Sequence, residues 1–85
     1  MNPDDGVLYD PHAELQMRRR KVSRSQVLEV LRNYHTSHPA EPLRHSPLRS
    51  MIYMGTVQGR ELKVYIRDGS SPVYVTTVAW KDERT

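Results

Sequence analysis

The chain of 85 residues contains no cysteine and no long hydrophobic run. The lack of cysteine excludes disulfide bonds and thiolate zinc sites, and it suits a reducing cytoplasm. No apolar stretch approaches the roughly 20 residues that a membrane-spanning helix needs, and the acidic N-terminal residues do not resemble a signal peptide. We therefore expect a cytoplasmic protein without a membrane segment. The length predicts a single domain over residues 1–85 with a small core.

Several catalytic motifs are also missing. The chain has no closely spaced carboxylate pair typical of a glycosidase, no glycine-rich phosphate loop, and no serine in a nucleophile-elbow motif. Three of the four histidines lie within residues 35–49, but no cysteine or acidic cluster nearby completes a metal shell. We expect no metal and no small-molecule cofactor. A metal-binding or sensor protein built on these histidines is a minor alternative.

Two helix starts stand close together in the first third of the chain. Asp10 can cap a helix that begins at Pro11 and runs to about Arg20, because its side-chain oxygen can accept from the free amides of the first turn. Ser23 and Gln26 form a capping box for a second helix, in which apolar residues repeat at three and four positions. The short connection predicts a tight αα-hairpin.

From Ser50 onward, apolar and polar residues alternate as they do in β-strands. The pattern predicts strands at 50–58, 61–67 and 73–80, joined by turns. Two helices packed on a three-stranded antiparallel β-meander make an α+β fold. Regular alternation in the last strand predicts that four residues share one face: Val73, Val75, Thr77 and Ala79.

The remaining segments are assigned as connections and ends. Residues 35–49 contain three prolines and are expected to form a long loop, because proline excludes a regular helix or a central strand. Residues 1–6 and 82–85 are expected to be flexible tails. The apolar residues 7–9 can add an edge strand or pack beneath the first helix.

Positive charge is concentrated on the predicted helical hairpin. The net charge is +3, and residues 12–24 carry five arginine and lysine side chains against Glu14 alone. Such a cluster favours an anionic partner, either nucleic acid or an acidic protein segment, although basic runs are often only solvated helix faces. His12, Gln16 and Arg20 follow one another at intervals of four residues and therefore share one side of the first helix.

This set of side chains suits the cleavage of RNA without a metal. The 2′-hydroxyl of RNA supplies the nucleophile, so the protein has only to position the strand, move protons and stabilise charge on the phosphate. Histidine titrates near neutrality, arginine can donate two hydrogen bonds to a phosphate, and tyrosine can stack on a base. A binding protein would use the same residue types.

A histidine motif on the first helix resembles the signature of a known family. In this chain it reads His12-Ala13-x-x-Gln16-Met17-x-x-Arg20-x-Val22-Ser23. The family signature is His-Ala-x-x-Arg-Met-x-x-Arg-x-Ile-Ser. It belongs to a small bacterial domain-of-unknown-function family related to the BrnT and RelE-like toxins of toxin–antitoxin systems. Similarity over about residues 9–80 extends to Tyr53-x-Gly55, to Gly59-Arg60-x-Leu62-x-Val64 and to the strand Val75–Trp80.

The resemblance implies a RelE/BrnT-like fold of helices followed by a twisted antiparallel sheet. It implies a toxin that cleaves mRNA, either on the ribosome or free, and an acidic antitoxin that masks the basic surface. His12 matches the family histidine and Arg20 matches the second family arginine. Gln16 replaces the first arginine, keeps hydrogen-bonding capacity but loses the charge, and so favours an alternative function: a non-catalytic module that binds protein or nucleic acid.

The predicted site combines the helix with the middle strand. His12 is expected to act as acid or base, or else to orient its helix through hydrogen bonds. Arg20 is expected to bind phosphate, or else to clamp a sheet carbonyl or Glu29. Lys63 and Tyr65 complete the catalytic set, unless they are only the solvated exterior of a strand. Five further cations are expected to bind nucleic acid: Arg18, Arg19, Lys21, Arg24 and Arg67. Trp80 is assigned as an edge-packing aromatic.

Overall fold

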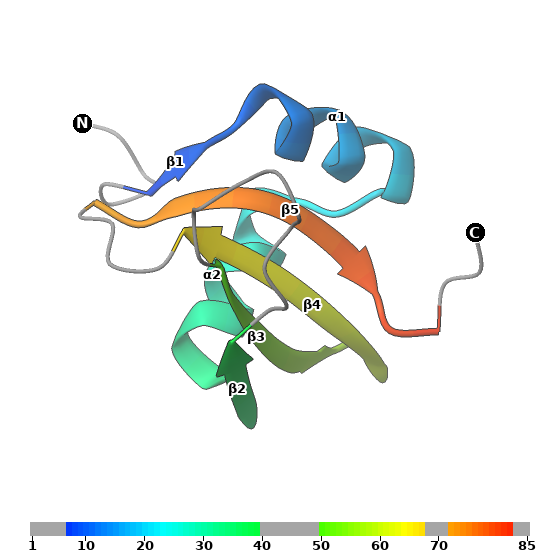
Figure 1. The fold of residues 1–85 in the computed structure, drawn as a ribbon. Helices are drawn as coiled ribbons and strands as arrows, with labels where there is room; N and C mark the ends of the chain where they lie inside the picture. The colour runs from blue at the N-terminus through cyan, green and yellow to red at the C-terminus, as the bar shows by residue number, and fades with distance from the viewer. Residues whose placement is uncertain (1–6, 40–49, 68–71, 83–85) are drawn as a thin grey trace.

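Two helices and five strands make up the fold of residues 7–39, 50–67 and 72–82, the residues that the computed structural model describes. The strands form one mixed sheet in the order β1-β5-β4-β3-β2, so the protein is α+β (Figure 1). In chain order the elements are β1 (Leu8–Tyr9), α1 (Pro11–Arg20), α2 (Arg24–Asn33), β2 (Thr36–Pro39), β3 (Ser50–Val57), β4 (Arg60–Arg67) and β5 (Tyr74–Trp80).

The prediction of a three-stranded antiparallel β-meander is wrong. Strands β3, β4 and β5 do pair antiparallel, but β1 adds to β5 in parallel and β2 adds to β3 in antiparallel orientation. The short β1 is held by the amide of Leu8, which donates to the carbonyl of Val73 at 2.8 Å. Of the two options for residues 7–9, the edge strand is therefore confirmed.

Strand β2 lies within residues 35–49, which are predicted to form a loop because of their three prolines. Its four residues are all exposed, and it forms the edge of the sheet beyond β3. Proline is tolerated on an edge strand, because the missing amide hydrogen can fall on the side without a neighbour. Pro39 therefore excluded a central strand but not this one. The rest of the predicted loop, residues 40–49, and the predicted tail 1–6 lie outside the described residues.

Both helices begin where their capping residues predict. The side chain of Asp10 accepts from the amide of His12, with Pro11 at the first helical position. The capping box of Ser23 and Gln26 is complete in both directions. Helix α1 ends at Lys21, which takes a left-handed conformation with φ 57°. Each helix has ten residues, and in the described part of the chain no helix is long and apolar enough to cross a membrane.

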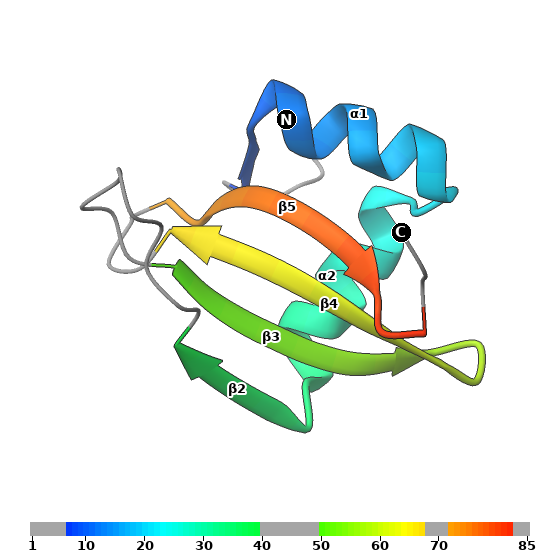
Figure 2. The ribbon, with the colours of Figure 1, turned by 45° about the vertical axis from the view of Figure 1, so that its right-hand side comes forward.

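The helices pack mainly on the sheet rather than on each other. Figure 2 shows α1 running along β5 and α2 lying behind β3 and β4, in agreement with the residues in contact. The short connection of the predicted αα-hairpin is present, but each helix covers its own strands. Both contribute to one core on one side of the sheet, where the helical members are Ala13, Met17, Val27 and Val30 and the strand members include Val57, Leu62, Val64, Val75, Val78 and Trp80.

A β-bulge changes which residues of β5 face this core. Tyr65 pairs with Thr77, but its neighbour Ile66 pairs with Val75, so one residue of β5 is left over between them. The extra residue reverses the alternation. Val75 therefore shares the core face with Val78 and Trp80, and the prediction that it shares a face with Thr77 and Ala79 is wrong.

The contact between Gly55 of β3 and Val30 of α2 gives a test of this packing. A Cβ atom at Gly55 would lie 3.4 Å from Cα of Val30, an ordinary contact distance. We expect Gly55→Ala to change the free energy of unfolding by no more than about 1 kcal/mol, because alanine also favours the strand over glycine. Gly55→Leu should destabilise the protein by about 1–3 kcal/mol, because the longer side chain must push α2 away.

Urea denaturation of both variants and the wild type measures these differences. Equal stability of the leucine and alanine variants would show that α2 does not rest on β3 at this point.

Candidate functional site

A row of three polar side chains runs along α1 and is joined by hydrogen bonds. The amide nitrogen Nε2 of Gln16 lies 3.2 Å from Nε2 of His12. The guanidinium of Arg20 donates through Nη1 to Oε1 of the same glutamine. The predicted stripe of His12, Gln16 and Arg20 is therefore confirmed as a continuous row, which we call the α1 row.

The α1 row is fastened to β5 at Arg20. Its Nη1 also donates to the main-chain oxygen of Val78 at 3.0 Å, and the indole nitrogen of Trp80 donates back to the main-chain oxygen of Arg20 at 3.0 Å. At Val78, β5 has β4 as its neighbour on one side. On the other side β1 pairs only with Tyr74 and Val75, so in the described residues Arg20 supplies the donor there instead of a strand. The prediction of a clamp to a sheet carbonyl is confirmed.

A cationic hollow of about 430 Å³ lies beside this clamp. It is lined by Gln16, Arg19, Arg20, Arg60 and Trp80. The guanidinium of Arg60 stacks over the indole of Trp80, 4.2 Å from the ring centroid, and it also pairs with Asp82 at 2.9 Å. Arg19 and Arg20 belong to the predicted site, whereas Arg60 and Trp80 do not. These two are far from α1 in sequence, and only the pairing of β4 with β5 brings them together.

The other end of the α1 row meets a tyrosine and a further cation. Asp10 accepts from the amide of His12 and from the hydroxyl of Tyr74, both at 2.8 Å. The hydrogen bond from Tyr74, and next that from the His12 amide, lower the pKa of Asp10, and the same bond raises the pKa of Tyr74. The guanidinium of Arg67 stacks over the Tyr74 ring at 4.5 Å. Arg67 therefore comes close to the start of α1, as its place in the predicted site requires.

The five cations predicted on the hairpin do not form one surface. Arg18 and Arg24 line a separate hollow of about 290 Å³, which also includes Glu14. Arg24 pairs with Glu14 at 3.0 Å and stacks over the ring of Tyr9. Lys21 is exposed at the end of the helix. Of the predicted basic cluster, Arg20 belongs to the α1 row and Arg19 lines the hollow beside it.

Lys63 and Tyr65 lie on the other side of the sheet from the helices. They alternate along β4 with Leu62 and Val64, which are buried in the core. Their side chains therefore point to the opposite face. No hydrogen bond or ion pair that involves the described residues joins either of them to His12, so the structure does not bring the four predicted catalytic residues together.

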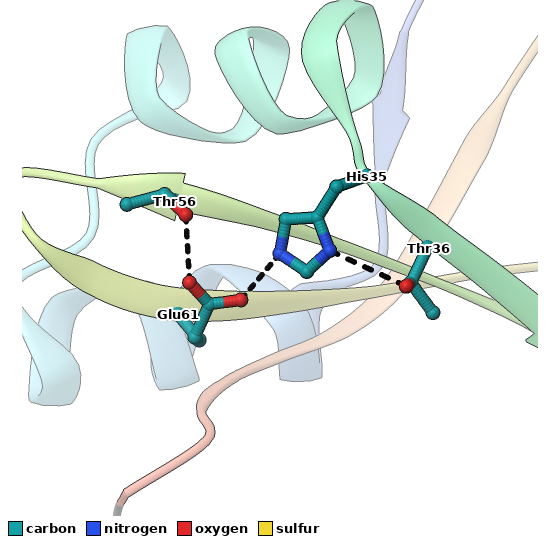
Figure 3. A network of polar contacts seen from close by, with 4 residues as sticks. All are labelled: His35, Thr36, Thr56 and Glu61. Carbon is teal, nitrogen blue, oxygen red and sulfur yellow. Dashed lines mark hydrogen bonds and ion pairs between the residues drawn. The ribbon is translucent and has the colours of Figure 1, made fainter.

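A second polar cluster, which the sequence analysis did not find, joins the edge of the sheet to its centre (Figure 3). The ring nitrogen Nε2 of His35 contacts Oε1 of Glu61, whose other oxygen accepts from the hydroxyl of Thr56 at 2.6 Å. The bond from Thr56, followed by that from His35, lowers the pKa of Glu61. His35 and Glu61 are 26 residues apart, so no local pattern signals the pair.

The three histidines predicted on a surface loop do not share one environment. His35 is bound to Glu61 as described, His38 is an exposed residue of β2, and His45 lies outside the described residues. In residues 7–39, 50–67 and 72–82 no three side chains of histidine, aspartate or glutamate come close enough together to hold a metal ion.

Fold and site together define a small α+β domain with a cationic helix edge. A family model described as "Domain of unknown function (DUF4258)" matches residues 9–80, and the chain therefore belongs to this family. The expected membership of a domain-of-unknown-function family is confirmed, whereas the relation to BrnT and RelE toxins stays a prediction. The searches of curated proteins and of solved structures found no match.

The clamp at Arg20 can be tested by a pair of arginine variants. We expect Arg20→Met to lower the free energy of unfolding by about 1–2 kcal/mol, because the buried carbonyl of Val78 loses its donor. Arg19→Met should change it by less than about 0.5 kcal/mol, because Arg19 is exposed and makes no hydrogen bond or ion pair in the described part of the chain. Thermal and urea unfolding measure both; equal losses in the two variants would contradict the clamp.

The bond between Tyr74 and Asp10 predicts a pH-dependent stability. Since the folded state holds the pKa of Asp10 below 3.8, this carboxylate stabilises the fold above pH 3.8, and the contribution is lost as pH falls through the lowered pKa. Tyr74→Phe removes the hydroxyl donor but keeps the ring under Arg67. We expect this variant to have a lower urea midpoint than the wild type at pH 6, with a difference that shrinks below pH 3.8. A constant difference across this range would exclude Asp10 as the titrating partner.

Proposed function

We propose that this protein binds RNA along the α1 row and cleaves it without a metal, as a toxin that a cognate antitoxin neutralises. The observation that supports this most directly is the α1 row itself. It places the exposed His12 between Arg67 at one end and the cationic hollow at the other. A phosphodiester chain lying on this edge would meet positive charge on both sides of a group that can transfer a proton.

The hydrogen bonds of the α1 row engage one ring nitrogen of His12. Arginine can only donate, so Oε1 of Gln16 is the acceptor for Arg20 and Nε2 of Gln16 is left to donate. The Nε2 atom of His12 then accepts this bond with its lone pair. When the exposed ring turns away from Gln16, this lone pair can take the proton of a 2′-hydroxyl. The 2′ oxygen then attacks the neighbouring phosphorus, the bond from phosphorus to the 5′ oxygen breaks, and the imidazolium gives the proton to that leaving oxygen. The clamp from Arg20 to Val78 holds the glutamine in place.

A second candidate function is a non-catalytic module that binds nucleic acid or protein through the same edge. Two observations favour it. Lys63 and Tyr65 lie on the opposite face of the sheet and supply no charge or hydroxyl group beside His12. Arg20 is engaged with Gln16 and Val78, which limits its contribution to the stabilisation of a reacting phosphate. The relation to RNA-cleaving toxins rests on the sequence resemblance, so an experiment is needed to distinguish the two functions.

Substitution of His12 separates the two functions. General acid–base catalysis contributes roughly 10²–10⁴-fold to a rate. We therefore expect His12→Ala to lower RNA cleavage by the purified protein at least about 100-fold, and to abolish growth arrest when the gene is induced in bacteria. His38→Ala is the matched control, because it removes an exposed histidine from β2, at the far edge of the sheet. Cleavage is measured on single-stranded RNA with and without ribosomes.

Three outcomes are informative. Cleavage that His12→Ala abolishes and His38→Ala spares supports the proposal. Cleavage that survives His12→Ala in a folded protein shows that the acid–base group is elsewhere. A wild-type protein that binds RNA but neither cuts it nor arrests growth is the non-catalytic module. Co-expression of the neighbouring gene tests for the antitoxin, which should restore growth.

A further inference from the structure

We propose that the cationic hollow at the end of α1 is a binding site for one phosphate group of a nucleotide chain. The site consists of three guanidinium groups, one amide and one indole: Arg19, Arg20, Arg60, Gln16 and Trp80. This site adds a place for the RNA backbone to the proposed function. Only the identification of RNA as the source of the phosphate rests on that function.

Charge in the hollow favours an anion. Three of its five lining side chains are arginines, and one of them, Arg60, pairs with the carboxylate of Asp82. The two partners of this pair are 48% and 66% exposed, so the ion pair is screened by water and contributes little. A phosphate can therefore replace Asp82 at small cost. Arg19 is exposed and makes no hydrogen bond or ion pair with the described residues, so its guanidinium is available to a ligand.

Two of the guanidinium groups are held in place before any ligand binds. Arg20 is fixed by its bonds to Gln16 and Val78, and Arg60 is fixed by stacking on Trp80. Fixed donors lose less conformational entropy on binding than mobile ones. The planar fork of a guanidinium also matches the spacing of two phosphate oxygens. Arrangement and charge together thus suit a phosphodiester, since its two non-bridging oxygens can accept from more than one guanidinium group.

The hollow selects the phosphate rather than the base. Trp80 is only 8% exposed and is covered by Arg60, so a nucleobase cannot stack on the indole. None of the five lining residues is a histidine, aspartate, glutamate or lysine that could transfer a proton. The site therefore binds a phosphate without regard to base identity and does not carry out the chemistry.

Its distance from His12 determines which phosphate it holds. His12 and Arg20 are eight residues apart in one helix, which corresponds to roughly 12 Å along the axis. One phosphate group cannot reach both. The phosphate in the hollow is therefore a neighbour of the one beside His12, and the site positions the strand for it. This predicts that an oligonucleotide binds more tightly than a mononucleotide.

The chain offers a built-in reporter for this site, since Trp80 is its one tryptophan. Its fluorescence is recorded while the full-length protein is titrated with adenosine, with adenosine 5′-monophosphate, with inorganic phosphate and with a short single-stranded RNA made non-cleavable by 2′-deoxy substitution. We expect a saturable change with the monophosphate, no change with adenosine, and at least tenfold tighter binding of the oligonucleotide than of either the monophosphate or inorganic phosphate.

Arginine variants locate the binding. Arg19→Gln should weaken binding of the monophosphate about tenfold, because a charge-assisted hydrogen bond to phosphate is lost. Arg60→Gln should weaken it to a similar degree, and its fold is checked by circular dichroism because it also loses the stacking contact. Arg32→Gln on α2 removes an equal charge away from the hollow and should leave the affinity unchanged.

Four results would overturn the assignment: the same fluorescence change with adenosine, no saturable change with the monophosphate, an equal loss in Arg32→Gln, or equal affinity for inorganic phosphate and the oligonucleotide. The outcomes are separate from those for the proposed function, because the monophosphate is a ligand and not a substrate. If the protein binds the monophosphate but does not cut RNA, the phosphate site is supported and the ribonuclease proposal is contradicted. If the protein cuts RNA but does not bind the monophosphate, the ribonuclease proposal is supported and the phosphate site is contradicted.

Discussion

Two hydrogen bonds at Arg20 join α1 to β5, and the arrangement of the candidate site depends on them. The side chain donates to Val78 while the main-chain oxygen accepts from Trp80. The first bond satisfies a carbonyl on a stretch of β5 that β1 does not reach, and the second satisfies an indole that is buried in the core. Since buried polar groups need partners, the helix is held in one position along the strand. The order of the α1 row and the walls of the cationic hollow follow from that position.

Features of the fold that depend on neighbouring residues in sequence could be predicted. Asp10 and the capping box of Ser23 set the helix starts, because a cap acts within one turn. Alternation located β3, β4 and β5. The outer strands could not be derived in this way, because β1 and β2 are too short to show a period and exist only through their pairing with β5 and β3. The bulge in β5 was missed for a similar reason, since nothing in the alternation marks the extra residue.

In the candidate site, too, the parts that could be predicted depend on residues close together in sequence. The α1 row follows from the helical spacing of His12, Gln16 and Arg20, and the carbonyl clamp was one of the stated alternatives for Arg20. Arg60 and Trp80 approach α1 only after the strands have paired, and the contact between His35 and Glu61 joins the residue before β2 to β4. Lys63 and Tyr65 were assigned to the site from residue type and alternation, which give the face of a strand but not which face the helices cover.

The central claim is that RNA lies along the edge formed by α1 and the end of β5. Its most direct test is the change in backbone amide chemical shifts when a non-cleavable single-stranded RNA is added to isotope-labelled protein. The account predicts that the largest changes fall on α1 and on residues 78–82, and that β2 and β3 are little affected. Changes centred on β2 and β3, or on the face of β4 that carries Lys63 and Tyr65, would contradict it.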